Sequence, residues 1–418
     1  MRPLRPGPRG LFFRLFYRAS TYNIPMDRNS AMRFILMMGL VSLFGDMAYE
    51  GGRSMTGPFM AFLGASAAVV GVVSGLGEFL GYSLRLVFGL AADRTRAYWP
   101  LTFLGYGLTF AIPFLALAGT WQAAAAFIIL ERVGKAIRSP ARDAILSYAT
   151  KQVGRGWGFA IHEAMDQIGA IAGPLIFAGI FAWKNSYRAG FGVLAVPAAL
   201  MFLFLVLSRA RARSPEDFEA MKKAGPLTQA ESRFSASYRH YAAFSFLCVA
   251  GFINFQIISY HWKAQAMFPM AWIPLIYALA MGVDAAAALA VGKAYDRWGL
   301  KTLGLIPLFT VCVPVLVFLP AGLPAAAGVA VVWGVIMGMH ETVMRAAIAD
   351  LTHIQKRGFG YGLFNALYGA AWFFGSSMAG WLYDRHRIFV FLFVFVVELA
   401  AFAVFWKYLR KPATKPAD

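Results

Sequence analysis

Charged side chains are scarce in this sequence. They make up 14% of its 418 residues, whereas about 25% is usual for a soluble domain. Apolar residues make up 59% of the chain, compared with roughly 45–50% in soluble proteins. So few charges could not cover the surface of a water-soluble protein of this length. The composition therefore excludes that class and indicates a protein embedded in lipid.

Cysteine is also scarce, and the common catalytic motifs are absent. Both cysteines, Cys248 and Cys312, lie within apolar runs, so the sequence has no disulfide framework and no CxxC metal or redox pair. It contains no GxxxxGK[ST] loop for ATP, no HExxH, no GxSxG and no paired metal-ligand spacing. We therefore expect no enzymatic activity, no bound metal and no cofactor.

Long apolar segments fill most of the chain. Each approaches the roughly 20 residues that a membrane-spanning helix needs. The sequence therefore predicts an all-α membrane protein with twelve transmembrane helices. They centre on residues 32–50, 67–90, 99–118, 121–145, 157–182, 189–208, 242–262, 271–294, 302–319, 324–349, 359–382 and 388–408.

Polar stretches divide these spans into two groups of six. Residues 1–30 form a basic tail without the layout of a cleavable signal, and residues 11–18 could form either an interfacial helix or part of a disordered tail. Residues 209–241 are the only long polar interruption. We expect an N-terminal six-helix bundle over 31–208, a linker over 209–241, a C-terminal bundle over 242–408 and a tail over 409–418.

The net charge of +19 follows the membrane topology rather than a basic surface for nucleic acid. With the N-terminus inside, 30 of the 39 Lys and Arg residues fall on inside segments and six, Arg53 among them, on outside segments. Basic residues gather on the cytoplasmic side of membrane proteins. Both termini and the linker are therefore expected to be cytoplasmic, in a cytoplasmic (inner) membrane.

The two halves of the chain repeat each other. GLAADR at 89–94 follows the second span, and GKAYDR at 292–297 follows the eighth, 203 residues later. RGWGF at 155–159 opens the fifth span, and RGFGY at 357–361 opens the eleventh, 202 residues later. Two matches at nearly one offset indicate a duplicated six-helix unit. Such halves, related by an axis normal to the membrane, form transporters with a cavity between them.

With these motifs the chain resembles the major facilitator superfamily, of bacterial type, over almost its whole length. The resemblance implies that the two GxxxDR stretches close the cytoplasmic side, each aspartate accepting hydrogen bonds from a neighbouring helix N-terminus and pairing with arginine. The gating residues it implies are Gly89, Asp93, Arg94, Gly292, Asp296 and Arg297. A third copy at 380–385 falls on the outer side, where the motif has no such role.

Charges in the fourth span form one stripe. Glu131, Lys135, Arg138 and Arg142 lie within about 40° of one another on a helix. Burying them costs on the order of 10 kcal/mol, so the stripe must face protein or water. The resemblance implies that spans 1, 4, 7 and 10 line the cavity. Glu131, Lys135 and their neighbour Arg132 are then candidates for substrate contact, with Glu131 and Lys135 as a pair. Arg138 and Arg142 are expected to pair with Asp93 or Asp143 at the gate.

Other intramembrane polar residues extend the candidate cavity. Glu78, Tyr82 and Arg85 share a face of the second span, and the seventh and tenth spans contribute Asn254, Gln256, His340, Glu341 and Arg345. A structural ion-pair network between spans 2, 4 and 5 would also explain many of these charges. Asp284 and Glu398 stand alone in spans 8 and 12.

Three carboxylates are candidates for proton coupling. Asp46 and Glu50 lie one turn apart in the first span, either in the cavity or as a hydrated pair at the outer mouth. Two neighbouring carboxylates repel each other when both are ionised, so one is expected to hold a proton. Asp166, on the same face as His162, is the third. Asp46 is the first choice because its own helix has no basic residue on the adjacent turns.

These features predict a secondary active transporter that moves a small polar or charged organic solute by alternating access. GAIAGP at 169–174 resembles part of a motif of exporters and favours export, although small residues also serve close helix packing. Together with the candidate coupling carboxylates it predicts proton-coupled export. An importer or facilitator, and a non-transporting protein for assembly or sensing, are the alternatives. The expected partners are the lipid bilayer, the solute and protons, without nucleic acid, and the chain is expected to be a monomer.

Overall fold

A computed structural model describes residues 28–211, 236–318, 322–352 and 357–409, in which every regular element is a helix. The first half contains α2 (Arg28–Phe62), α3 (Ala67–Thr95), α4 (Tyr98–Gly107), η2 (Leu108–Phe110), α5 (Ala111–Phe114), η3 (Leu115–Leu117), α6 (Trp121–Val153), α7 (Arg155–Lys184), α8 (Tyr187–Val193) and α9 (Ala195–Arg211). The second half contains α10 (Ala236–Gly251), α11 (Phe255–Ala264), α12 (Trp272–Trp298), η6 (Gly299–Gly304), α13 (Leu305–Phe318), α14 (Gly322–Leu351), α15 (Arg357–Arg385), α16 (Arg387–Val404) and η8 (Phe405–Leu409).

These helices form the twelve spans that the sequence predicts. Within the described ranges, nine stretches are long and apolar enough to cross a membrane. One of them, Trp272–Phe318, turns at η6 and contains two spans, α12 and α13. The long helices α6 and α15 complete the set. The all-α architecture with twelve spans is confirmed, whereas most of the two predicted tails and most of the predicted linker lie outside the described residues.

The first span is longer than predicted. The expected end near residue 50 is wrong, because α2 continues to Phe62. Glu50, at the end of the expected span, and Arg53, assigned to an outside segment, are both buried inside α2. Arg53 reaches Glu50 at 3.6 Å on its own helix and Glu78 at 2.8 Å on α3, so charges of both signs compensate each other within the bundle.

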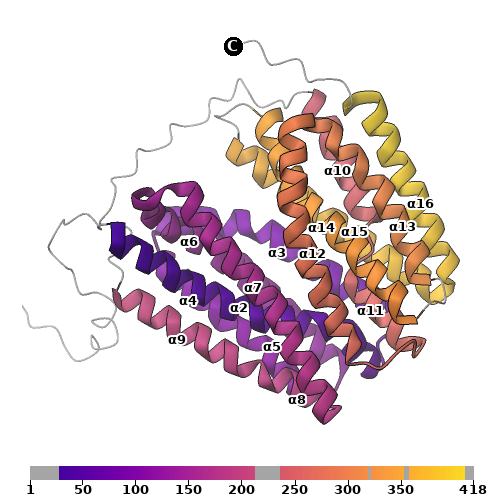
Figure 1. Cartoon of the computed structure of the whole chain (residues 1–418), viewed down its shortest axis with the longest axis horizontal. Helices are drawn as coiled ribbons and strands as arrows, with labels where there is room; N and C mark the ends of the chain where they lie inside the picture. The colour runs from indigo at the N-terminus through magenta and orange to yellow at the C-terminus, as the bar shows by residue number, and fades with distance from the viewer. Residues whose placement is uncertain (1–27, 212–235, 319–321, 353–356, 410–418) are drawn as a thin grey trace, which may run out of the picture.

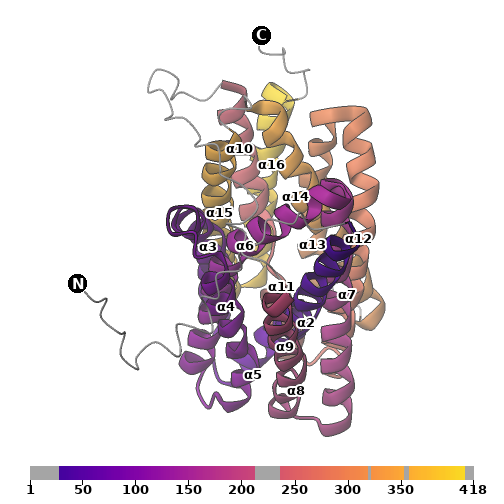
Figure 2. The same ribbon diagram turned by 90° about the vertical axis from the view of Figure 1, so that its left-hand side faces the viewer.

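The two halves pack against each other at one end of the molecule and diverge at the other, where α9 ends and α10 begins (Figure 1). We call the side where α9 ends and α10 begins the linker side, and the opposite side, where α2 ends and α3 begins, the far side. The long helix α3 packs along α15, α7 packs against α12, and α11 packs against α2. Figure 2 shows the same helices from the side that holds the first half. Contacts between the halves are tightest toward the far side, where an added Cβ on Gly71 would lie 2.2 Å from the carbonyl oxygen of Ser376.

Candidate functional site

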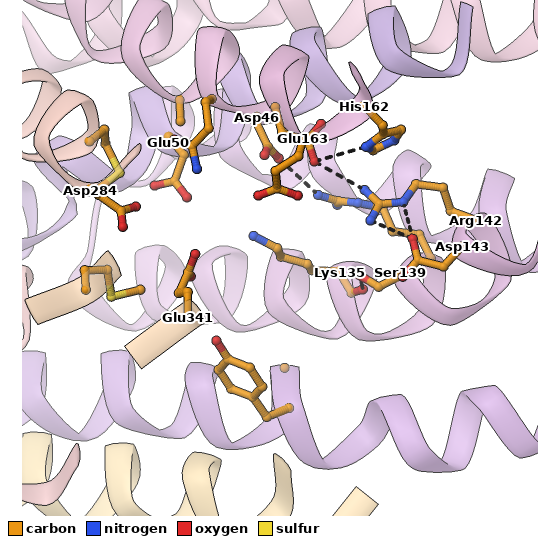
Figure 3. A pocket seen from close by; sticks show the side chains of 18 of the residues that line it. Asp46, Glu50, Lys135, Ser139, Arg142, Asp143, His162, Glu163, Asp284 and Glu341 are labelled. Carbon is orange, nitrogen blue, oxygen red and sulfur yellow. Dashed lines mark hydrogen bonds and ion pairs between the residues drawn. The ribbon is translucent and has the colours of Figure 1, made fainter. Parts of the chain in front are cut away.

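A cavity of about 560 Å³ lies between the two halves. It reaches the linker side at the start of α7, where Gly156 and Phe159 line it and are exposed. Charged side chains dominate its wall (Figure 3). They are Asp46, Glu50, Arg53, Glu78, Arg85, Arg132, Lys135, Arg138, Arg142, Asp143, Glu163, Asp166, Asp284 and Glu341. The helices that supply them, α2, α3, α6, α7, α12 and α14, come from both halves.

Eleven of the 22 predicted site residues line this cavity. Its lining includes the predicted substrate residues Glu78, Tyr82, Arg85, Arg132, Lys135 and Glu341, the predicted coupling residues Asp46, Glu50 and Asp166, and the predicted gating residues Arg138 and Arg142. The reading of Asp46 and Glu50 as a pair at the outer mouth is wrong, because α2 extends a further three turns beyond them toward the far side.

Glu78 is the centre of a buried ion-pair cluster. Its Oε1 lies 2.8 Å from a guanidinium nitrogen of Arg53 and 2.8 Å from one of Arg132. The guanidinium of Arg132 also lies over the ring of Tyr49, at 4.7 Å from its centroid. A structural ion-pair network between spans 2, 4 and 5 was the alternative expected from the sequence, and this cluster is its part between spans 2 and 4. Arg53 of α2 also belongs to the cluster, although the sequence placed that residue outside the first span.

Glu131 pairs with Arg138 rather than with Lys135. Its Oε1 lies 3.5 Å from Nη1 of Arg138, which also donates a hydrogen bond of 2.8 Å to the hydroxyl of Thr109. Glu131 is 1% exposed and does not line the cavity. The predicted pair with Lys135 is therefore wrong: within the described part of the chain, no ion pair joins the two. Arg138, two turns along α6, packs against α4, where Gly105 gives it space.

Lys135 instead presents its ammonium group to the cavity. Its Nζ lies 4.2 Å from the centroid of the Tyr49 ring. Among the described residues, no carboxylate forms an ion pair with it within 4.0 Å. Figure 3 shows the ammonium group pointing into the space between Glu50 and Glu341. Lys135 is thus a cation whose charge is available to a solute.

Arg142 lines the part of the cavity that is nearer the linker side. It forms an ion pair of 2.8 Å with Asp143, as predicted, and it lies 3.8 Å from Asp166. It also donates a hydrogen bond of 2.9 Å to Ser42 of α2. His162 lies 3.5 Å from Asp166, which confirms that the two share a face of α7. The expected pairing of Arg138 with Asp93 or Asp143 is wrong, because Arg138 faces Glu131 and, at 4.0 Å, Asp46.

The second half contributes an acidic wall, of which the sequence predicted Glu341 but did not assign Asp284 to the cavity. Asp284 of α12 lines the cavity, is 4% exposed, and forms no hydrogen bond or ion pair with any residue that the structure describes. Glu341 of α14 lies beside it, across the cavity from Lys135 (Figure 3). The available signal was an isolated carboxylate in the middle of the eighth span, which is costly in a membrane and marks a functional position.

Three predicted cavity residues lie elsewhere. Asn254 caps α11 by accepting a hydrogen bond of 3.1 Å from the amide of Gln256, because the seventh span breaks between α10 and α11. Gln256 packs against Gly57 of α2 through its backbone. His340 lies against the rings of Phe252 and Tyr368. None of the three lines the cavity, so these predictions are wrong. The side chain of Arg345 lies outside the described residues.

The predicted gate residues lie at the linker side. Asp93 accepts a hydrogen bond of 3.3 Å from the hydroxyl of Tyr98 in the next helix of the same half. Arg94, Asp296 and Arg297 are exposed. An added Cβ would lie 3.6 Å from the nearest atom at Gly89 and 3.5 Å at Gly292, so both glycines have space around them. No cross-half hydrogen bond to Asp93 or Asp296 occurs in the described ranges.

A known protein family and several known proteins are similar to this chain in sequence. The sequence model of the Major Facilitator Superfamily matches residues 39–342 and 260–418. The uncharacterised protein Rv2265 of Mycobacterium tuberculosis is 40% identical over 392 residues, which covers 93% of this chain and 95% of that protein. An uncharacterised MFS-type transporter of Methanocaldococcus jannaschii is 32% identical over 177 residues, covering 41% of this chain and 43% of its own.

Solved structures share the fold. The nucleoside transporter NupG superposes with a TM-score of 0.72 at 14% identity, covering 90% of this chain and 99% of that one. A bacterial homologue of the human lysosomal transporter Spinster, inward-facing and occupied, gives 0.70 at 13% identity, covering 92% and 98%. The family model spans nearly all of the twelve helices. The chain therefore belongs to the major facilitator superfamily and is a multi-pass membrane transporter, not an enzyme.

Proposed function

We propose that this protein is a proton-coupled exporter of a small organic solute that carries both a positive and a negative charge. It would work by alternating access in the cytoplasmic membrane, as a monomer with its linker side in the cytoplasm. The excess of Lys and Arg on the linker-side segments supports that orientation. Among transport modes, an importer or a facilitator of the same fold is the alternative that the experiment below separates.

One observation carries the substrate class: charges of opposite sign face each other across the cavity without an ion pair to any described residue. Lys135 on α6 has no ion pair, and Asp284 on α12 has neither an ion pair nor a hydrogen bond among the described residues. A buried charge without a partner is costly, so a solute that supplies the opposite charges relieves the cost at both walls. An anionic group at Lys135 and a cationic group at Asp284 would also bridge the two halves.

Proton coupling requires a carboxylate that changes protonation when the two halves move. Asp46 remains our first choice, because it lines the cavity and its nearest cation, Arg138, is 4.0 Å away at the limit of an ion pair. Asp166 has Arg142 at 3.8 Å and His162 at 3.5 Å. Glu50 is bound more firmly, by a hydrogen bond of 2.6 Å from Tyr277. Asp284 joins these candidates because its charge is not compensated by a described neighbour.

The small-residue motif in α7 supports alternating access. An added Cβ on Gly169 would lie 2.2 Å from the carbonyl oxygen of Leu43, and one on Gly173 would lie 2.1 Å from that of Met47. The motif therefore forms the close seam between α2 and α7, as its packing interpretation predicts. Such close backbone contacts would let α2 and α7 move together as one rigid body. The export direction rests on the resemblance of this motif to that of exporters.

Proteoliposomes loaded with a pH-sensitive dye test the proposal. Zwitterionic, cationic, anionic and neutral solutes of similar size are added in turn, and both the uptake of each solute and the direction of the proton movement that it elicits are recorded. We expect zwitterions to elicit proton movement, and Lys135→Gln and Asp284→Asn each to reduce the initial rate at least tenfold. Lys184→Gln is the matched control, because that lysine lies over Trp183 outside the cavity.

The outcomes separate the alternatives. Proton movement in the same direction as the solute would show an importer, and solute movement without proton movement would show a facilitator. A response to neutral solutes alone, unchanged in Lys135→Gln and Asp284→Asn, would overturn the substrate class while leaving transport in place. No movement of any solute by a protein that is folded and reconstituted would favour a non-transporting role.

A further inference from the structure

The third GxxxDR copy, at residues 380–385, engages the other half of the protein. Asp384, near the end of α15, accepts two backbone hydrogen bonds from the first turn of α3: Ala67 N to Oδ1 at 3.0 Å and Ala68 N to Oδ2 at 2.9 Å. The first amides of a helix have no partner within the helix, and the positive end of the helix dipole favours a carboxylate. Asp384 thus satisfies both needs of α3 from across the boundary between the halves.

The glycine of the same motif permits this contact. An added Cβ on Gly380 would lie 2.3 Å from the carbonyl oxygen of Ala67, and one on Gly71 would lie 2.2 Å from that of Ser376. The backbones of α3 and α15 therefore touch on the far side. Gly380 and Asp384, four residues apart, lie on one face of α15. One residue permits the approach and the other binds the exposed amides.

The two linker-side copies of the motif, at 89–94 and 292–297, have no comparable hydrogen bond to the other half among the described residues. Gly89 and Gly292 have space around them, and Asp93 is bound only by Tyr98 of its own half among the described contacts. The cavity reaches the linker side. The third copy is therefore closed while the first two are open, so the same short motif is used at both sides but not in the same conformation.

We propose that Asp384 is a gating residue that holds the far side closed while the cavity is open on the linker side. The carboxylate leaves the first turn of α3 when the far side opens, and water then satisfies the amides of Ala67 and Ala68. Weakening this contact shifts the protein toward the conformation that is open on the far side. Weakening Asp93 acts in the opposite direction.

Distances between spin labels test the proposal in the full-length protein. Phe62→Cys and Ile388→Cys report the far side, and Trp157→Cys and Trp298→Cys report the linker side; all four side chains are exposed. The background carries Cys248→Ser and Cys312→Ser. We expect Asp384→Asn to increase the ratio of far-side-open to far-side-closed protein at least tenfold, with a matching shortening between the linker-side labels. Asp384→Glu should restore much of the closed population.

Two further variants make the result specific. Arg385→Gln is the control, because that guanidinium lies over Trp381 of its own helix and should leave both distances unchanged. Ala67→Pro removes one donor but keeps every charge. Proline is tolerated at the first position of a helix, and Ser66 before it already has the extended backbone that proline requires (φ −76°, ψ 166°). Ala67→Pro should shift the populations in the same direction as Asp384→Asn.

Equal distance distributions in Asp384→Asn, Ala67→Pro and the wild type would overturn the gating role. A loss of thermal stability in Asp384→Asn without any change in the ratio of the two conformations would also overturn it, because a purely structural cap stabilises both conformations alike.

Discussion

The hydroxyl of Tyr277 on α12 donates a hydrogen bond of 2.6 Å to Oε2 of Glu50 on α2, and so joins the two halves at the wall of the cavity. Glu50 is 7% exposed, and its other oxygen lies 3.6 Å from Arg53. A hydrogen bond to a buried charge contributes about 1.5–3 kcal/mol. The bond therefore connects a candidate coupling carboxylate directly to the relative position of the halves.

Tyr277→Phe should favour the conformation that is open on the far side. Loss of the hydroxyl leaves the Glu50 carboxylate without its cross-half donor in the present conformation. A free-energy change of about 1.4 kcal/mol corresponds to a tenfold change in the ratio of the two conformations. Spin-label distances across the far side measure that ratio. Tyr238→Phe is the matched control, because its hydroxyl donates to the carbonyl of Gly360 within the second half; an equal shift in both variants would contradict the role of the Tyr277 bond.

Glu78→Gln should be one of the most destabilising single substitutions in the protein. It leaves the buried guanidinium groups of Arg53 and Arg132 without their shared carboxylate, and breaking such a cluster costs about 3–5 kcal/mol. Unfolding in mixed micelles measures the loss. Asp143→Asn breaks a pair whose aspartate side chain is 50% exposed, so its cost should be about 0–1 kcal/mol. Equal losses in the two variants would show that burial does not determine the energetics of these pairs.

A double-mutant cycle should place the energetic partner of Glu131 at Arg138. The two side chains lie 3.5 Å apart, with exposed fractions of 1% and 2%. Each single neutralisation leaves one buried charge, whereas the double change removes both. Glu131→Gln and Arg138→Gln should therefore be less destabilising together than the sum of the single effects. Glu131→Gln with Lys135→Gln should show a much smaller coupling; a larger one would restore the pair expected from helix spacing.

Reporter fusions should place both termini and the linker in the cytoplasm. The expectation rests on the excess of basic residues in the tails, in the linker and in the other linker-side segments. Fusions after Asp418 and near Lys222 should both give a cytoplasmic signal in cells. A periplasmic signal from either fusion would reverse the orientation, and with it the side to which the cavity opens.

The number and order of the helices could be predicted from sequence, because twelve apolar segments of the right length leave little choice. The stripe on α6 was largely predictable from helix periodicity: of its four members, Lys135, Arg138 and Arg142 reach the cavity and Glu131 does not. The partners of these charges were not predictable. Glu131 and Lys135 are one turn apart in sequence, yet the packing of α6 against α4 turns Glu131 toward Arg138.

Contacts between helices account for the remaining errors. The sequence placed Arg53 outside the first span. Its partner Glu78 lies 25 residues away on α3, so the pairing could not be inferred from spacing along one helix. We assigned His340 and Gln256 to the cavity wrongly, because helix periodicity alone does not show which face of a helix packs against another helix. Asp384 was visible as a third copy of a motif, but its role depends on the first turn of α3, 316 and 317 residues away in the chain.

Proton-driven transport through Asp46 is the central claim, and Asp46→Asn in proteoliposomes tests it most directly. An imposed pH gradient should drive solute accumulation by the wild type and not by the variant. Exchange of labelled for unlabelled solute without a gradient should persist in the variant, because exchange needs no net movement of protons. Gradient-driven accumulation that persists in correctly folded Asp46→Asn would contradict the claim, and Asp166, Glu50 and Asp284 would then be the carboxylates to substitute next.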